Sequence, residues 1–110
     1  MALKFPERGS KELRKGRFSL KEALYFVTTC CYNKEKVFLY RENVQIFFDA
    51  LDWFVNKGHI DLHFCIVMPD HAHLVFQLIG DKALSEVMKS LKQFTGRKIK
   101  QRMGIKNSVW

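Results

Sequence analysis

The 110-residue sequence predicts a single α+β domain in which two helices cover one face of an antiparallel sheet. Three observations predict this architecture. Three short segments are rich in alternating apolar and β-branched residues, two longer segments repeat apolar residues at helical spacing, and the order is β-α-β-β-α. This order is typical of a ferredoxin-like or RRM-like sheet before its last strand, so we expect the fold to be cut short here.

The first strand and the first helix are separated by a polar segment. Residues 25–30 (YFVTTC) are β-branched and aromatic, which predicts a strand. Residues 33–41 read as a polar loop. A helix is expected over residues 43–56 and is ended by Gly58. Its apolar positions are Val44, Phe47, Phe48, Leu51, Phe54 and Val55.

The next two strands form a hairpin over residues 60–67 and 71–78, with the turn at Pro69-Asp70. Strict alternation places Leu62, Phe64, Ile66 and Met68 on one face of the first of these strands. In the second, one face holds Ala72, Leu74, Phe76 and Leu78, and the other holds His71, His73, Val75 and Gln77. The wholly apolar face is suited to burial under helices, which leaves the histidine face as a half-covered working surface.

The last element is an amphipathic helix over about residues 84–103. Five apolar residues are expected to face inward, with Phe94 near their margin. They are Leu84, Val87, Met88, Leu91 and Ile99.

The two histidines at positions 71 and 73 carry the clearest chemical signal. Because side chains alternate along a strand, both imidazoles project from one face, where they can share one metal ion. Asp70 is the nearest candidate for a third ligand, on weak grounds. A structural role is the alternative for the pair, and it is our interpretation for His59 and His63.

The net charge of +8 is segregated along the chain. Residues 1–22 carry seven basic and three acidic side chains, residues 23–81 four and seven, and residues 82–110 eight and one. The middle is therefore mildly acidic and both ends are basic. Segregated positive charge predicts a surface for a polyanion, most simply nucleic acid, with a solvated basic helix and tail as the alternative.

Cysteine use and hydropathy bound the location of the protein. The three cysteines, Cys30, Cys31 and Cys65, match no zinc-binding spacing and read as buried free thiols. No apolar run approaches the roughly 20 residues that cross a bilayer, and the N-terminus has no segment of signal-peptide type. We therefore expect no membrane contact and a cytoplasmic protein, which would associate with the nucleoid if its polyanionic partner is DNA.

The His-Ala-His segment, followed by three large apolar residues, resembles the HUH motif of single-strand DNA endonucleases. The preceding Met68–Asp70 is similar to the lead-in of the single-tyrosine HUH transposases, including the REP-associated transposases. The likeness also covers the strand at 25–29 and the helix at 84–100. Residues 23–110 are therefore expected to form a transposase HUH domain after a basic N-terminal extension over 1–22.

The resemblance implies strand-specific cleavage of single-stranded DNA. In the family a histidine pair, here His71 and His73, holds a divalent ion with a further polar ligand, and the ion polarises the scissile phosphate. A tyrosine hydroxyl attacks the phosphorus and gives a 5′-phosphotyrosyl enzyme. The ion is Mg²⁺ or Mn²⁺, and imidazole ligands favour Mn²⁺, so we expect Mn²⁺ to bind more tightly.

The family's nucleophile has no match in this sequence. In the family it lies on a helix after a tryptophan similar to Trp110, whereas Tyr25, Tyr32 and Tyr40 all precede His71. We expect the catalytic tyrosine beyond Trp110, so the chain is either a truncated transposase or a remnant without chemistry. As written, the polypeptide is not expected to form the covalent intermediate.

Single-stranded or hairpin DNA is the partner that both the charge and the resemblance indicate. Phosphate contacts are assigned to the basic side chains of the last helix, which are Lys89, Lys92, Arg97, Lys98, Lys100 and Arg102. Phe18 and Tyr32 are candidates to stack on bases, with core packing as the alternative. The family includes homodimers that share active sites as well as monomers, so the oligomeric state stays open.

Two other functions are consistent with the residues. A non-catalytic RRM-like nucleic-acid-binding module would stack bases on exposed aromatic residues of its central strands, but the open positions of the 71–78 strand hold none. A zinc-stabilised interaction domain would use the same two histidines and would unfold on chelation.

Overall fold

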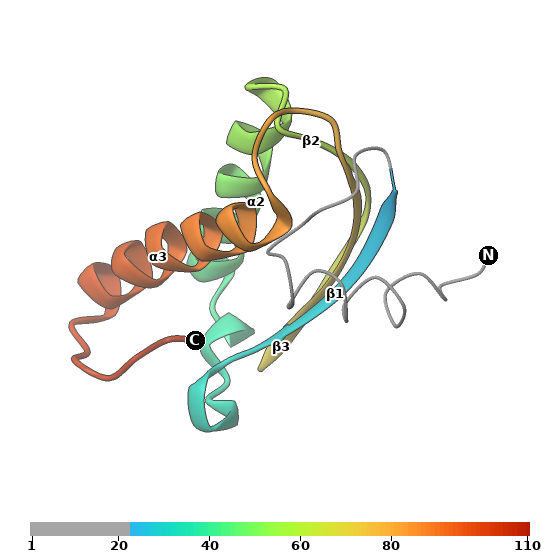
Figure 1. Ribbon diagram of the computed structural model, residues 1–110. Helices are drawn as coiled ribbons and strands as arrows, with labels where there is room; N and C mark the ends of the chain where they lie inside the picture. Colours follow the sequence, from blue (N-terminus) through green and yellow to red (C-terminus); the bar gives the residue numbers. More distant parts are fainter. Residues whose placement is uncertain (1–22) are drawn as a thin grey trace.

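The computed structural model describes residues 23–110, so the basic extension over 1–22 lies outside the described residues. The helices and strands within this range are β1 (Leu24–Cys30), α2 (Arg41–Asn56), β2 (Ile60–Met68), β3 (His71–Leu78) and α3 (Leu84–Met103). Figure 1 shows both helices on one side of a curved sheet. The α+β class and the order β-α-β-β-α are therefore confirmed.

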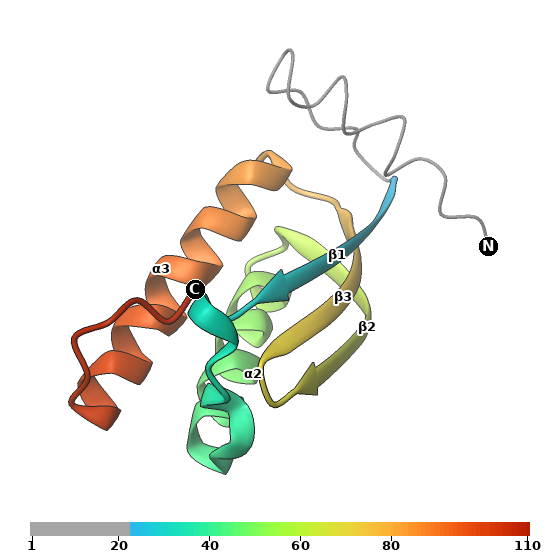
Figure 2. The same cartoon turned by 90° about the horizontal axis from the view of Figure 1, so that it is seen from below.

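The sheet has the strand order β1-β3-β2, and both pairings are antiparallel. β2 and β3 form the expected hairpin around Pro69-Asp70, and β1 pairs with the other edge of β3 (Figure 2). β3 is therefore the central strand, with a neighbour on each side.

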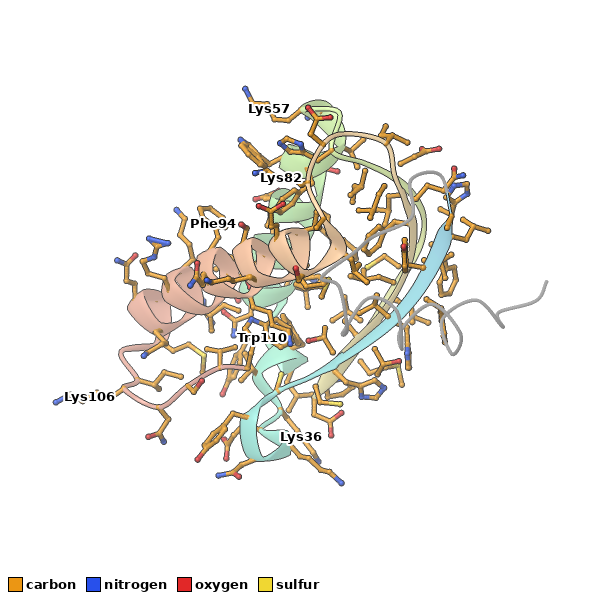
Figure 3. All side chains as sticks on the ribbon, viewed as in Figure 1. Lys36, Lys57, Lys82, Phe94, Lys106 and Trp110 are labelled. Carbon is orange, nitrogen blue, oxygen red and sulfur yellow. The ribbon has the colours of Figure 1, made fainter. Side chains whose placement is uncertain are left out.

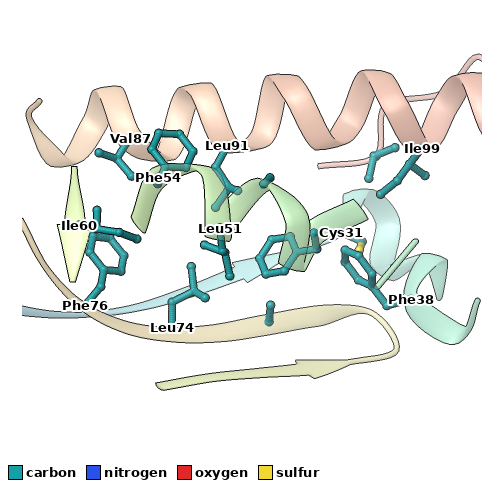
Figure 4. Close-up of a cluster of buried hydrophobic side chains, with 14 of the residues drawn as sticks. Cys31, Phe38, Leu51, Phe54, Ile60, Leu74, Phe76, Val87, Leu91 and Ile99 are labelled. Carbon is teal, nitrogen blue, oxygen red and sulfur yellow. The ribbon is translucent and has the colours of Figure 1, made fainter. Parts of the chain in front are cut away.

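The core lies between the sheet and the two helices (Figure 4). Along β3 buried and half-buried residues alternate, because successive side chains point to opposite faces of a pleated strand. The four predicted core residues of β3 are all at most 1% exposed: Ala72, Leu74, Phe76 and Leu78. On α3, Val87, Leu91 and Ile99 meet them across the layer, while Phe94 is 42% exposed. The histidine side of β3 therefore faces away from the helices.

A β-bulge in β2 overturns the strict alternation expected for that strand. Leu62 pairs with Phe76, but the next paired residue is Phe64, opposite Val75, so His63 is left over between them. One extra residue shifts every later side chain to the opposite face. Leu62 therefore faces the core, whereas Phe64, Ile66 and Met68 lie on the histidine face and are 40–50% exposed.

The segment expected to be a polar loop over 33–41 is partly buried. It contains two short 3-10 turns, Tyr32–Lys34 and Val37–Leu39, and both Val37 and Phe38 are 5% exposed. The first helix begins at Arg41, two residues earlier than expected. Asn43 at its start is fully buried and donates a hydrogen bond to the Val37 carbonyl at 2.7 Å. This amide ties the buried turn to the helix, which the apolar pattern of the sequence does not reveal.

The chain folds back along α3 after that helix ends. Gly104 has φ = 67°, a left-handed conformation that suits glycine and turns the chain. Trp110 then lies beneath α3 (Figure 3), and its Nε1 donates to Thr95 Oγ1 at 3.0 Å. A Cβ atom at Gly96 would lie 3.5 Å from the Trp110 ring, so this glycine leaves room for the indole. Residues 104–110 therefore form one wall of the groove described below.

Candidate metal centre and nucleic-acid interface

His71 and His73 stand on the open face of the central strand, as the alternation predicts. Their ring centroids are 4.9 Å apart, and both residues are partly exposed. His71 Nδ1–H donates to the Asp70 carboxylate at 2.6 Å, because an ionised carboxylate can only accept. The same hydrogen bond is the largest cause of the lowered pKa of the Asp70 carboxyl. Asp70 therefore orients His71, rather than standing ready as the third ligand we considered.

His73 is held from two sides by residues of β1. Its Nδ1 forms a hydrogen bond of 3.0 Å with Thr28 Oγ1. Its ring stacks on Phe26, with the centroids 5.9 Å apart and the planes 7° from parallel. The Nδ1 atoms of both histidines are thus engaged and the Nε2 atoms carry no hydrogen bond within residues 23–110, an arrangement common in metal-binding histidines.

A complete protein ligand set for a metal is not found in the described part of the chain. No group of three His, Cys, Asp or Glu side chains there is arranged to hold an ion. The cross-strand partners of His71 on β1 and β2 are Cys30 and Met68. Cys30 is exposed, because it lies on the open face of β1. The prediction that all three cysteines are buried is therefore wrong for Cys30. Residues 23–110 therefore bring two imidazoles together without a third ligating side chain arranged beside them.

The other two histidines have the structural roles expected of them. His59 follows α2 and packs its ring against Trp53 and Phe54, with centroids 5.5 and 6.0 Å away. His63, the bulged residue of β2, donates from Nε2 to Gln77 Oε1 at 3.0 Å. Gln77 lies four residues beyond His73 on the same face of β3, so His63 is at the far end of the open face from His71.

Three of the six predicted DNA contacts line one groove between α3 and residues 104–110. The groove has a volume of about 990 Å³ and no acidic side chain in its lining. The basic residues that line it are Lys92, Arg97, Lys100 and Lys106. Lys106 was not predicted, because it follows the helix and carries no periodic signal; only the folding back of the chain brings it here.

The other three predicted contacts do not line this groove. Arg102 donates to Asn43 Oδ1 at 2.9 Å and lies over the Tyr40 ring, so it also fastens α3 to α2. Lys98 lies 5.7 Å from the centroid of the Phe94 ring. Lys89 is exposed on α3.

The groove and the histidine pair lie on different sides of the sheet. α3 belongs to the helical layer, whereas His71 and His73 are on the face that the helices leave open (Figure 1). Lys106 extends outward on the helical side in Figure 3. A DNA strand that reaches both must therefore pass around the domain, so we treat them as two sites.

A comparison with protein-family models decides the family. The model described as "Transposase IS200 like" matches residues 19–110. The chain belongs to the IS200-like transposase family. No curated protein sequence matches the chain.

Two solved structures are similar in fold to this IS200-like transposase chain. A REP-associated tyrosine transposase bound to a REP hairpin is 21% identical, with a TM-score of 0.63, and the match covers 86% of this chain and 55% of that one. A Deinococcus radiodurans R1 protein assigned as a transposase is also 21% identical, with a TM-score of 0.62 and coverages of 81% and 68%. This chain thus spans little more than half of the first structure and about two thirds of the second.

The tyrosines of this family member are scattered. Tyr25 is 4% exposed and faces the core, on the opposite side of the sheet from the histidines. Tyr32 and Tyr40 are 48% and 50% exposed, and Tyr40 packs against Arg102.

Within residues 23–110, neither helix has the length and hydropathy needed to cross a bilayer.

Proposed function

We propose that this chain carries the metal-binding and DNA-binding part of a transposase that cuts and rejoins single-stranded or hairpin DNA. The observation that carries the proposal is the histidine pair. Two imidazoles share the open face of the central strand, each is oriented through its Nδ1 atom, and each keeps its Nε2 atom without a hydrogen bond within residues 23–110.

The proposed ligands of a divalent ion are the Nε2 atoms of His71 and His73. For His71 the carboxylate of Asp70 selects the tautomer with a proton on Nδ1, which leaves the lone pair on Nε2. Thr28 selects the same tautomer of His73 when its hydroxyl oxygen accepts a hydrogen bond from Nδ1–H. Water, a phosphate oxygen or a further protein ligand completes the shell. When bound, Mn²⁺ or Mg²⁺ would polarise the scissile phosphate and offset charge on the leaving oxygen.

The proposed reaction uses a tyrosine other than Tyr25, Tyr32 and Tyr40, the three tyrosines of this sequence. Its hydroxyl oxygen forms a bond to phosphorus while the bond from phosphorus to the 3′ oxygen breaks, and the 3′ oxygen takes up a proton. The products are a 5′-phosphotyrosyl link and a free 3′-hydroxyl, so rejoining needs no external energy source. Because Tyr25, Tyr32 and Tyr40 all precede the histidines, we expect this polypeptide to bind DNA without forming the covalent link.

DNA is the proposed partner for two reasons. The structurally similar REP-associated transposase is bound to a REP hairpin. The groove beside α3 gathers four basic side chains and no acidic side chain, which is the electrostatic character of a phosphate-binding surface. A homodimer remains part of the proposal, as does association with the nucleoid, which would follow from DNA binding.

Metal titration tests the proposal. We expect Mn²⁺ binding, followed by electron paramagnetic resonance, in the wild-type protein and its loss in a His71→Ala/His73→Ala variant that still folds. His63→Ala is the matched control, because it removes an exposed histidine from the far end of the same face and should leave Mn²⁺ binding intact. Equal Mn²⁺ binding by the wild-type protein and the double variant would contradict the proposal.

The same titration separates the two other functions. A zinc-stabilised domain would lose its folded structure when a chelator is added, whereas the proposed transposase keeps it. A non-catalytic RRM-like module would bind single-stranded DNA with no specific ion site. The exposed rings of Phe26 and Phe64 favour that second candidate more than the sequence alone did, because they lie on the two strands that flank β3.

A further inference from the structure

The open face of the sheet is arranged in rows that run across all three strands. Residues directly opposite each other in antiparallel strands point to the same face. Val75 on β3 is paired with Phe26 on β1 and with Phe64 on β2. We call Phe26, Val75 and Phe64 the phenylalanine row. The next row contains His73 between Thr28 and Ile66.

Both aromatic rings of the phenylalanine row are accessible. Phe26 on β1 is 40% exposed and Phe64 on β2 is 50% exposed, although phenylalanine is among the residues most often buried. The stack on His73 sets the plane of the Phe26 ring nearly parallel to the imidazole. A further flat ring can therefore extend that stack, while Phe64 offers a second ring on the other side of Val75.

The size of this surface favours a narrow ligand. Neighbouring strands lie about 4.8 Å apart and alternate residues about 7 Å apart, so the exposed apolar patch covers on the order of 300 Å². A stable interface with a second copy of the chain needs about 800 Å² from each partner. The patch is also interrupted by the two imidazoles and Thr28. A single nucleic-acid strand fits this shape better than a protein does.

The position of the row also points to nucleotides. It lies one row from His73 and two from His71. The Phe26 ring is 5.9 Å from the His73 ring, which is in turn 4.9 Å from the His71 ring, measured between centroids. A nucleotide joins a flat base to a phosphate across one sugar, and neighbouring nucleotides repeat this unit. A phosphate at the histidine pair would therefore bring a base of the same or the adjacent nucleotide over the phenylalanine row.

We propose that the phenylalanine row is a base-stacking platform for single-stranded DNA whose backbone passes the histidine pair. The inference rests on the proposed function, because it takes DNA as the ligand. It adds a subsite that contacts the bases of the strand. Stacking on a ring is tolerant of sequence, so the platform positions the strand and does not select particular bases.

Fluorescence anisotropy with two probes tests the platform: a short oligothymidylate and an abasic oligonucleotide of the same length. The wild-type protein should bind the oligothymidylate more tightly than the abasic strand. Phe64→Ala should weaken oligothymidylate binding roughly 5- to 150-fold and leave abasic binding unchanged. Phe26→Ala should have a similar effect, but Phe64 is the cleaner site because no ring contact joins it to a histidine.

Phe94→Ala is the matched control. Phe94 has a similar exposure, 42%, but lies on α3 in the helical layer, so its removal should change binding to neither probe. Phe64→Leu guards against misfolding, because leucine keeps the apolar bulk and loses the flat ring. It should reduce the preference for the oligothymidylate as Phe64→Ala does, with the Phe26 ring still in place, while circular dichroism shows a folded protein.

The outcomes separate this inference from the proposed function. If the wild-type protein binds both probes equally, or if Phe64→Ala and Phe64→Leu keep the full wild-type preference for oligothymidylate, the platform is overturned and DNA binding stands. If the wild-type protein binds neither probe, the proposed function fails and the platform fails with it.

Discussion

At the scale of single residues, two buried threonines differ in whether their hydroxyl groups have hydrogen-bond partners. Thr29 on β1 is 3% exposed, and its Oγ1 has no hydrogen-bond partner among residues 23–110. Thr95 on α3 is fully buried, donates to the Leu91 carbonyl at 2.7 Å and accepts from Trp110 Nε1. A buried hydroxyl without a partner lowers stability, whereas a satisfied one contributes to it.

Exchanging each hydroxyl for a methyl group should therefore change stability in opposite directions. Thr29→Val should raise the free energy of unfolding by about 1 kcal/mol, because it removes an unsatisfied polar atom. Thr95→Val should lower it by about 1–2 kcal/mol, since the Trp110 indole loses its acceptor. Urea unfolding measures both. A loss of stability in Thr29→Val would show that this hydroxyl has a partner outside residues 23–110.

The three thiols should differ in reactivity. Burial raises the pKa of both Cys31 and Cys65 to about 11, so only about one in a thousand of each is thiolate at pH 8. Cys30 is exposed on the open face. We expect iodoacetamide at pH 8 to modify Cys30 first, and the rates at the other two to rise as the pH approaches 11. Peptide mass spectrometry follows the order, and equal rates at pH 8 would contradict it.

At the scale of elements, the bulge at His63 determines which side chains the open face displays. Before it, Ile60 and Leu62 face the core; after it, Cys65 and Val67 take over that role. The side-chain period of a strand is two, so one unpaired residue reverses the faces of everything that follows. The bulge thereby places Phe64 on the open face and completes the phenylalanine row.

Deleting His63 should be tolerated, because it removes the unpaired residue. Leu62 and Phe64 then become neighbours opposite Phe76 and Val75, so every side chain of β2 keeps its present face. We expect this deletion variant to unfold cooperatively, with a free energy of unfolding within about 1 kcal/mol of the wild type. His63→Ala should change the free energy of unfolding by about 0.5 kcal/mol or less, because the side chain is largely exposed. Loss of cooperative thermal unfolding in the deletion variant would contradict the assignment of His63 as the extra residue.

At the scale of the whole molecule, the basic groove and the histidine pair are separated. Residues 82–110 carry eight basic side chains and one acidic, and much of this charge lies around the groove beside α3. The histidine pair lies across the sheet from it. The groove should therefore supply affinity for DNA that is independent of the metal.

Salt dependence tests this separation. Each phosphate contact contributes about 0.7–0.9 to the slope of log K against log salt concentration. Lys92→Ala, Lys100→Ala and Lys106→Ala should each lower the slope by about that amount, whereas His71→Ala/His73→Ala should leave it unchanged. Lys57→Ala is the control, since Lys57 is exposed at the end of α2, well away from Lys106 (Figure 3). An equal loss of slope in the control would mean that affinity depends on net charge alone.

Local periodicity in the sequence was sufficient for most of the fold. The alternation over residues 71–78 predicts that His71 and His73 share a face and that Ala72 and Leu74 are buried, and both hold. The bounds of β3 and α3 agree closely with the predicted segments. These features are local, because the direction of a side chain depends on the strand or helix that carries it.

The sequence by itself therefore determined the order of elements, the family and the face that carries the histidines. Only the tertiary structure decided what surrounds them: Asp70 and Thr28 on their Nδ1 atoms, and Phe26 and Phe64 in the neighbouring row. Lys106 joined the groove in the same way, through the fold of the chain after Gly104. The physical reason is that hydrophobic periodicity specifies a face, whereas strand order, register and bulges specify which side chains meet on it.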